Sequence, residues 1–183
     1  MIYPDKSDKS DSLYPFGVIG LKQVLPMRER YQSATDLMES ARDAAKELER
    51  INLQLASMDS ARDVKAQGYS GVQSHSKDVN GMGATERLID YEERVKPRLR
   101  ADEAILEDAM NVLYGTDGRG GVSKGIGSCY ADVLMHRYLL MRTWDDTGWY
   151  CRVSAKTARK YAAVALDYID SVGFGAAMVG RQV

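Results

Sequence analysis

The stretch LMESARDAAKELERINLQLASM, residues 37–58, decides the fold class of this 183-residue chain. Its apolar residues recur at alternating intervals of four and three, which is the spacing of a coiled-coil seam. They are Leu37, Ala41, Ala44, Leu48, Ile51, Leu55 and Met58. We expect helical order to begin around Pro26, because proline suits a first helical turn. One such helix cannot bury its stripe alone, so it requires a partner helix.

A second helical stretch supplies that partner. Residues 84–113 repeat the pattern with Leu88, Tyr91, Val95, Leu99, Leu106, Met110 and Leu113. Asp102 interrupts the stripe, and Pro97 removes one backbone hydrogen bond and should kink the helix. Residues 63–83 are rich in glycine and serine and have no period, which predicts a loop. The simplest arrangement is an antiparallel helical hairpin over residues 26–114; self-association into a multi-chain coiled coil is the alternative.

The segments that flank this arm have other compositions. Residues 1–25 open with a mixture of Asp, Lys, Ser and Pro, which predicts a flexible leader. Residues 115–127 contain six glycines in 13 positions. A phosphate-binding P-loop would need Gly-Lys-Ser/Thr after a strand, whereas Lys124 stands between Ser and Gly. We therefore predict a hinge between two modules, and we predict a tail over residues 173–183.

The last third of the chain predicts a helix-turn-helix. Short helices are expected over residues 130–140, 144–151 and 154–172, and no stretch alternates as a strand would, so the fold class is all-α. In the turn between the last two helices, Val153 should pack inward and Ser154 should cap the following helix. Small residues at Thr147 and Gly148 suit a close crossing of the two helices. The predicted buried stripe of the last helix is Ala158, Tyr161, Ala165, Ile169 and Val172.

Charge is segregated along the chain. Residues 142–160 hold five basic and two acidic residues, a net charge of +3, whereas residues 84–108 hold five basic and eight acidic residues, a net of −3. The whole chain has a net charge of only −1, so DNA binding would need such a local basic face. The candidate DNA contacts are Arg142, Arg152, Ser154, Lys156, Thr157, Arg159 and Lys160.

These candidates fall into two predicted roles. Lys156 and Arg159, three positions apart near the helix start, are expected to face base edges in the major groove. The charges of Arg152 and Lys160 are better placed for phosphates. Near these candidates, Trp149 and Tyr150 are two aromatic residues expected to be exposed. They suggest an additional contact, with a protein or with a helix of the same chain.

The stretch VLMHRYLLMRTWDDTGWYCRVSAKTARKYAAVALDYI, residues 133–169, resembles the helix-turn-helix of domain 4 of bacterial sigma factors. The shared pattern is Val-Leu, Arg-Tyr, Trp followed by two acids, and Val-Ser before the recognition helix. With its long hairpin, the chain is similar to sigma-like phage and prophage proteins, including late-transcription regulators of the ArpU and RinA type. The sequence departs from sigma factors at Ala155 and Lys156, where Arg and Glu are typical, so the sigma promoter sequence is not implied.

The resemblance implies a phage-encoded transcription regulator in the cytoplasm of a bacterial host. Its partner would be double-stranded DNA, and the arm would mediate homodimerisation or contact with RNA polymerase. Two alternatives stay open. The module could instead bind a host protein without binding DNA, or the chain could be a small terminase-like subunit of a DNA-packaging machine, which would form a large ring.

Other classes lack the residues they need. The cysteines Cys129 and Cys151 and the histidines His75 and His136 are too few and too scattered for a zinc module. No nucleophile, base and orienting group can be assembled, so we expect no enzymatic activity, cofactor or metal. The apolar runs are far shorter than the roughly 18 residues of a membrane span, so no membrane partner is expected.

Overall fold

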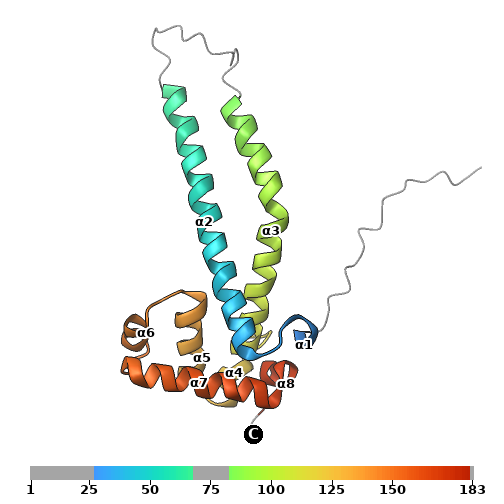
Figure 1. The fold of residues 1–183 in the computed structure, drawn as a ribbon, viewed down its shortest axis with the longest axis vertical. Coiled ribbons are helices and arrows are strands. Elements are labelled where there is room, and N and C mark those ends of the chain that lie inside the picture. The colour runs from blue at the N-terminus through green and yellow to red at the C-terminus, as the bar shows by residue number, and fades with distance from the viewer. Residues whose placement is uncertain (1–26, 68–82, 182–183) are drawn as a thin grey trace, which may run out of the picture.

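The computed structural model describes residues 27–67 and 83–181, which form helices joined by short turns and contain no strand (Figure 1). The all-α class is thus confirmed. The elements are α1 (Met27–Arg30), α2 (Ala34–Gln67), α3 (Gly83–Tyr114), α4 (Gly121–Gly125), α5 (Ser128–Leu134), the π-helix η1 (Met135–Leu139), α6 (Trp144–Tyr150), α7 (Ala155–Val172) and α8 (Phe174–Val179). The predicted leader and most of the loop predicted over residues 63–83 lie outside the described residues.

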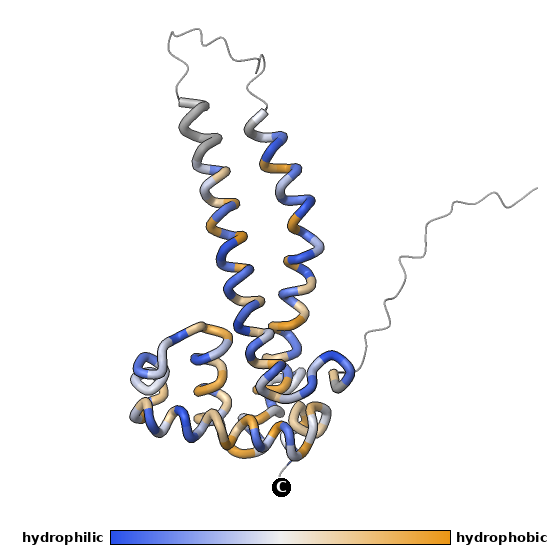
Figure 2. Tube along the Cα trace, in the orientation of Figure 1, coloured by the Kyte–Doolittle hydropathy of each residue, from blue (hydrophilic) through white to orange (hydrophobic). Residues whose placement is uncertain are grey.

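Two long helices form an arm that rises from a base of shorter helices (Figure 1). α2 and α3 lie side by side and run in opposite directions. Midway along the arm, Ile51 is fully buried against Tyr91 and Val95, and the Tyr91 hydroxyl donates to Gln54 Oε1 at 2.7 Å. Figure 2 shows isolated apolar positions along this mainly hydrophilic arm and denser ones in the base. The seam of the arm is therefore narrow, as its spacing predicted.

The start and end of α2 differ from the predicted boundaries. Helical order begins at Met27, next to Pro26 as predicted, but as the separate short helix α1, and the long helix α2 begins only at Ala34. Ser33 causes this break, because its Oγ accepts a hydrogen bond from Asp36 N at 3.2 Å. The Asp36 carboxylate in turn accepts from the backbone N–H of Gln32, the residue before the cap, at 3.0 Å. At its other end α2 continues to Gln67, so residues 63–67, predicted as loop, are helical.

The buried face of α3 shifts along its length, although the helix continues through Pro97. We predicted that Leu106 and Met110 would lie in the seam. Leu106 is partly buried against the core, but Met110 is 37% exposed, and Ala109 and Val112 are fully buried in its place. The reason is that the last turns of α3 contact α4, α5 and α8 as well as α2, so they bury a wide face rather than one narrow stripe.

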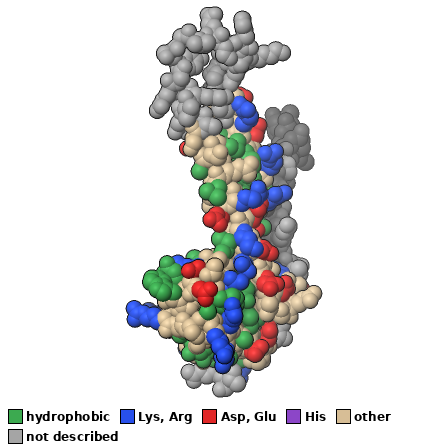
Figure 3. All heavy atoms as spheres, turned by 60° about the vertical axis from the view of Figure 1, so that its left-hand side comes forward, with side chains coloured by type: hydrophobic (Ala, Val, Ile, Leu, Met, Phe, Trp, Pro, Cys, Tyr) green, Lys and Arg blue, Asp and Glu red, His purple; other side chains and the backbone are tan. Residues whose placement is uncertain are grey.

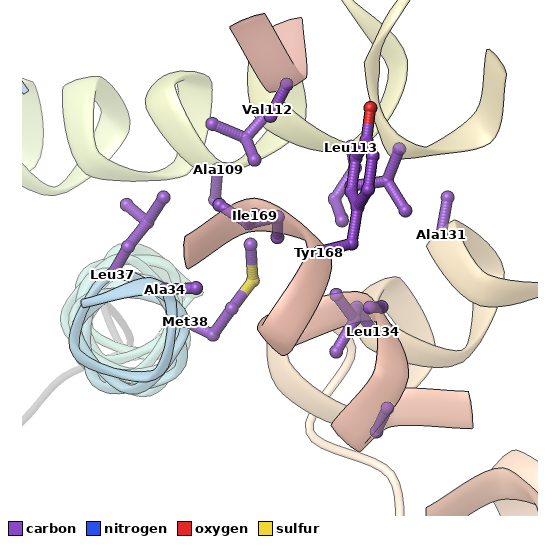
Figure 4. Packing of buried hydrophobic residues seen from close by; sticks show 14 of the residues in the cluster. Ala34, Leu37, Met38, Ala109, Val112, Leu113, Ala131, Leu134, Tyr168 and Ile169 are labelled. Atoms are coloured by element: carbon purple, nitrogen blue, oxygen red, sulfur yellow. The ribbon is translucent and has the colours of Figure 1, made fainter. Parts of the chain in front are cut away.

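The arm and the base share one hydrophobic core. Figure 4 shows side chains from α2, α3, α5 and α7 that point into it. The residues labelled there are Ala34, Leu37, Met38, Ala109, Val112, Leu113, Ala131, Leu134, Tyr168 and Ile169. The foot of the arm is therefore part of the base, and residues 128–172 have no separate core of their own.

The glycine-rich segment 115–127 is a packed element rather than the predicted hinge. It contains α4, in which Val122 is fully buried. A Cβ on Gly120 would lie 2.3 Å from the Met178 carbonyl oxygen, so a side chain has no room there. The glycines let the backbone approach its neighbours closely. A glycine-rich composition fits such a close-packed segment as well as a flexible hinge, so composition alone does not distinguish the two.

The predicted tail over residues 173–183 contains the helix α8. Gly173, with φ +79°, ends α7 and turns the chain into this helix. Phe174 is buried and meets the Tyr31 ring edge-on, with the ring centroids 6.3 Å apart. The Tyr168 hydroxyl donates to the Arg181 carbonyl at 2.5 Å and fastens the end of the segment.

Candidate nucleic-acid interface

α6 and α7 pack against each other across a turn of four residues, 151–154. Gly148 of α6 is buried, and a Cβ there would lie 2.7 Å from the Val153 carbonyl oxygen. Thr147 beside it is fully buried, and Val153 packs against the main core. The small residues and the inward valine thus act as the sequence predicted, and they hold the start of α7 close to α6.

Side-chain caps fix the starts of both helices. Thr143 Oγ1 accepts a hydrogen bond from Asp146 N at 3.2 Å at the start of α6. Ser154 Oγ accepts from Thr157 N at 3.1 Å at the start of α7, which confirms its predicted cap role. The two hydroxyls of Ser154 and Thr157 are also hydrogen-bonded to each other at 2.8 Å. Both hydroxyls are therefore already engaged within the chain.

An exposed basic edge runs from the turn into α7. Arg152 stands in the turn with φ +56°, and Lys156, Arg159 and Lys160 follow on the first turns of the helix. All four side chains are exposed. Within the part of the chain that the structure describes, none of them forms an ion pair with a carboxylate. The positive charge of this edge is therefore not neutralised by the described residues.

Two of the predicted DNA contacts are held by aromatic rings. The Arg142 guanidinium carbon lies 3.3 Å from the centroid of the Tyr150 ring, and Arg142 is half-buried. The Arg159 guanidinium carbon lies 5.7 Å from the centroid of the Trp144 ring. Such cation–π contacts orient a guanidinium without removing its charge. Arg142 is therefore not part of the exposed basic edge. Arg159 is part of that edge, and its guanidinium contacts the Trp144 ring.

An aromatic patch of His136, Trp149 and Tyr150 adjoins Arg142. Trp149 is 74% exposed, and its ring meets Tyr150 edge-on. Tyr150 in turn stacks on His136 with ring centroids 5.2 Å apart. His136 is half-buried, and burial together with the charge of Arg142 holds its pKa below the usual value.

Two arginines outside the predicted set lie near the basic edge. Arg137 of η1 places its guanidinium carbon 4.7 Å from the centroid of the Trp144 ring, the same ring that Arg159 contacts. Burial and the neighbouring charges of Arg42 and Arg159 lower the pKa of Arg137. Nothing in the sequence could have placed Arg42 here, because it belongs to the arm and reaches this site only when α2 packs against η1 and α7.

The described residues contain no group of three His, Cys, Asp or Glu side chains that could hold a metal ion. Cys151 is half-buried against the core, and burial raises the pKa of its thiol. Among the described helices none is long and apolar enough to cross a membrane. Comparisons of the chain with protein-family models, with curated proteins and with solved structures found no match.

Proposed function

We propose that this protein binds double-stranded DNA through the first turns of α7 and regulates transcription for a phage, without being an enzyme. The observation that carries the proposal is the exposed basic edge over residues 152–160. This edge has four basic residues and no acidic residue, and none of the four is ion-paired among the described residues. Phosphates are the partners that such a positive edge at a helix start favours.

The roles of the side chains follow from their places on the helix. Lys156 and Lys160 are one turn apart and therefore share a face of α7. Lys156, nearest the helix start, is best placed for base edges once the helix enters a major groove. Arg152, in the turn, is best placed for a backbone phosphate. Ser154 and Thr157 serve this interface by fixing the helix start.

The arm is proposed to contact a second copy of the chain or RNA polymerase. It projects from the base as a long, narrow surface (Figure 1). Two large apolar side chains, Leu53 and Ile89, are exposed on it at 66% and 49%. Burial of such side chains on a partner would contribute to association.

Fluorescence anisotropy of a labelled duplex, measured with the full chain at several salt concentrations, tests DNA binding. Lys156→Ala should cost about 1–3 kcal/mol on a selected duplex and relax the sequence preference. Arg152→Ala should weaken binding to all duplexes alike and lower the salt slope by about one. Lys96→Ala, an exposed charge on the arm, is the control and should change neither. Absence of binding at low salt, with helical circular dichroism intact, would contradict the proposal.

The exposed aromatic patch favours a second candidate, a module that binds a host protein. A tryptophan that is 74% exposed is a frequent anchor of protein interfaces. In that case Trp149→Ala would abolish binding of the host protein, while Arg152→Ala would leave that binding intact. The loss of duplex binding in Arg152→Ala but not in Trp149→Ala would favour the DNA-binding function.

A further inference from the structure

Two arginines from different elements lie on the ring of Trp144, and the charge of a third arginine, Arg42, acts on one of them. Arg137 of η1 and Arg159 of α7 both lie on the Trp144 ring, at 4.7 and 5.7 Å from the ring centroid. Arg42 comes from α2, which packs against both η1 and α7. Its charge is close enough to act on Arg137. The fold thus concentrates like charges that the sequence keeps far apart.

This concentration of charge is only partly compensated within the described part of the chain, where Arg137 Nη1 donates a hydrogen bond to the Arg142 carbonyl oxygen at 2.7 Å. None of the three arginines forms an ion pair with a described carboxylate. Arg42 Nε is inaccessible to solvent and has no hydrogen-bond acceptor. A buried donor without an acceptor is destabilising, and so is the repulsion between neighbouring cations. An anion that enters the cluster would remove both costs.

From this geometry we infer that Arg42, Arg137 and Arg159 form a binding site for a phosphate group. Guanidinium groups present forked N–H donors that match the oxygens of a phosphate, and they keep their charge at any physiological pH. The Trp144 ring orients two of the three without supplying an acceptor of its own. The site therefore offers several donors and a positive charge to one oxyanion.

If the proposed function holds, the occupant is a backbone phosphate of the DNA that α7 engages. Arg159 then contacts a phosphate rather than a base edge, because its guanidinium lies over the Trp144 ring, which Arg137 also contacts. Figure 3 shows Lys and Arg side chains that follow one another from the arm down onto the base on one face. A DNA strand on that face would meet the foot of the arm as well as α7. This inference rests on the proposed function only for the source of the phosphate.

The test has two parts, binding of a DNA duplex and binding of free phosphate. Both use the same full-length background protein. The chain has two tryptophans, so Trp149→Phe leaves Trp144 as the single fluorescent indole beside the cluster. In this background Arg42→Gln and Arg159→Gln are compared with Arg50→Gln, an exposed arginine on the same helix as Arg42. Since Arg42 is half-buried, the thermal unfolding of the Arg42→Gln variant is measured as well. The Arg42→Lys variant tests whether a positive charge at this position restores binding. Arg159 is exposed, so its variant tests the cluster without disturbing the core.

With the labelled duplex, Arg42→Gln and Arg159→Gln should each lower the salt slope by about 0.9, which is roughly an eightfold loss of affinity at about 0.1 M salt. Arg42→Lys should restore most of the lost affinity, and Arg50→Gln should leave the affinity unchanged. Binding of the duplex should shift the Trp144 emission. If the parent protein binds the duplex but Arg42→Gln keeps its salt slope, the phosphate site is rejected and the proposed function stands.

If the parent protein does not bind the duplex, the proposed function fails and inorganic phosphate decides the inference. A saturable shift of Trp144 emission on titration with inorganic phosphate, lost in Arg42→Gln, would show that the cluster takes a free phosphate group. No shift, or an equal shift in Arg42→Gln, would overturn the site.

Discussion

At the scale of single residues, the distance between α6 and α7 depends on a missing Cβ. The backbone of the turn passes so close to Gly148 that a methyl group would meet a carbonyl oxygen at 2.7 Å. The neighbour is backbone, so it cannot rotate away as a side chain could. The position of the basic edge relative to the base is therefore set by one residue without charge.

Gly148→Ala should destabilise the protein by about 1–3 kcal/mol, the range of overpacked positions. Gly175→Ala is the matched control, because a Cβ there meets nothing within 4 Å. The control should be neutral or slightly stabilising, since alanine favours a helix more than glycine does. Urea unfolding followed by circular dichroism measures both. Equal stabilities of the two variants would show that the close crossing is absent in solution.

His136 should make stability depend on pH. Its pKa is lowered from 6.5 in the folded protein by burial first and then by Arg142, against a smaller opposite effect of Asp132. The unfolded chain therefore binds more protons than the folded one as pH falls through the unfolded value, so stability is lost in that direction. Between about pH 7.5 and pH 5.5, His136→Gln should lose less stability than the parent protein. The parent protein is the reference, and an identical pH dependence in both proteins would contradict this assignment.

At the scale of elements, the arm depends on one narrow seam with few contacts. Ile51 is fully buried against α3, whereas Leu53, on the same helix, is 66% exposed. Asp102 weakens the seam, because burial and the nearby charge of Glu47 raise its carboxyl pKa. The helical spacing predicts which side chains of α2 contact α3, but it does not predict how much these contacts stabilise the arm.

Ile51→Asp should destabilise the arm by more than about 2 kcal/mol, because an unpaired charge would replace a buried side chain. Leu53→Asp introduces the same charge on the opposite face and should stay within about 0.5 kcal/mol of the parent protein. Circular dichroism melts and solution mass measure the effect. Unchanged helicity and mass in Ile51→Asp would exclude this seam as an interface, within one chain or between chains.

At the scale of the whole molecule, the base cannot be separated from the foot of the arm. Leu37 and Met38 of α2 and Leu113 of α3 are fully buried in the same core as α5 and α7 (Figure 4). Their removal would expose the inner face of the basic module. The module that carries the proposed DNA interface therefore depends on residues far away in the sequence.

A fragment of residues 128–183 should be largely unfolded on its own. It lacks the side chains that α2 and α3 add to the core, and a segment of its size buries little surface by itself. A chain of residues 27–183 keeps the whole core and should retain the melting transition of the parent protein. Circular dichroism of both polypeptides is the measurement, and a cooperative transition in the short fragment would contradict the shared core.

Features that depend on local spacing and hydrogen bonding could be predicted from the amino-acid sequence. The four-and-three spacing around Ile51 predicted the seam, and Ser154 was predicted as the cap of α7 from its place before a helix. Gly148 was predicted at a close crossing for its size. These features need only neighbours along the chain, so a linear pattern contains them.

Features that depend on distant segments could not be predicted in this way and became clear from the packing of the folded chain. The glycines of α4 gave the same composition as a hinge, and the α8 segment carried no helical period long enough to predict. Ala109 and Val112 replaced Met110 in the core because the base covers α3 from several sides. Arg42 joined Arg137 through the packing of α2 on η1. Each of these outcomes depends on which surfaces meet after folding, and that is a property of long-range packing rather than of local spacing.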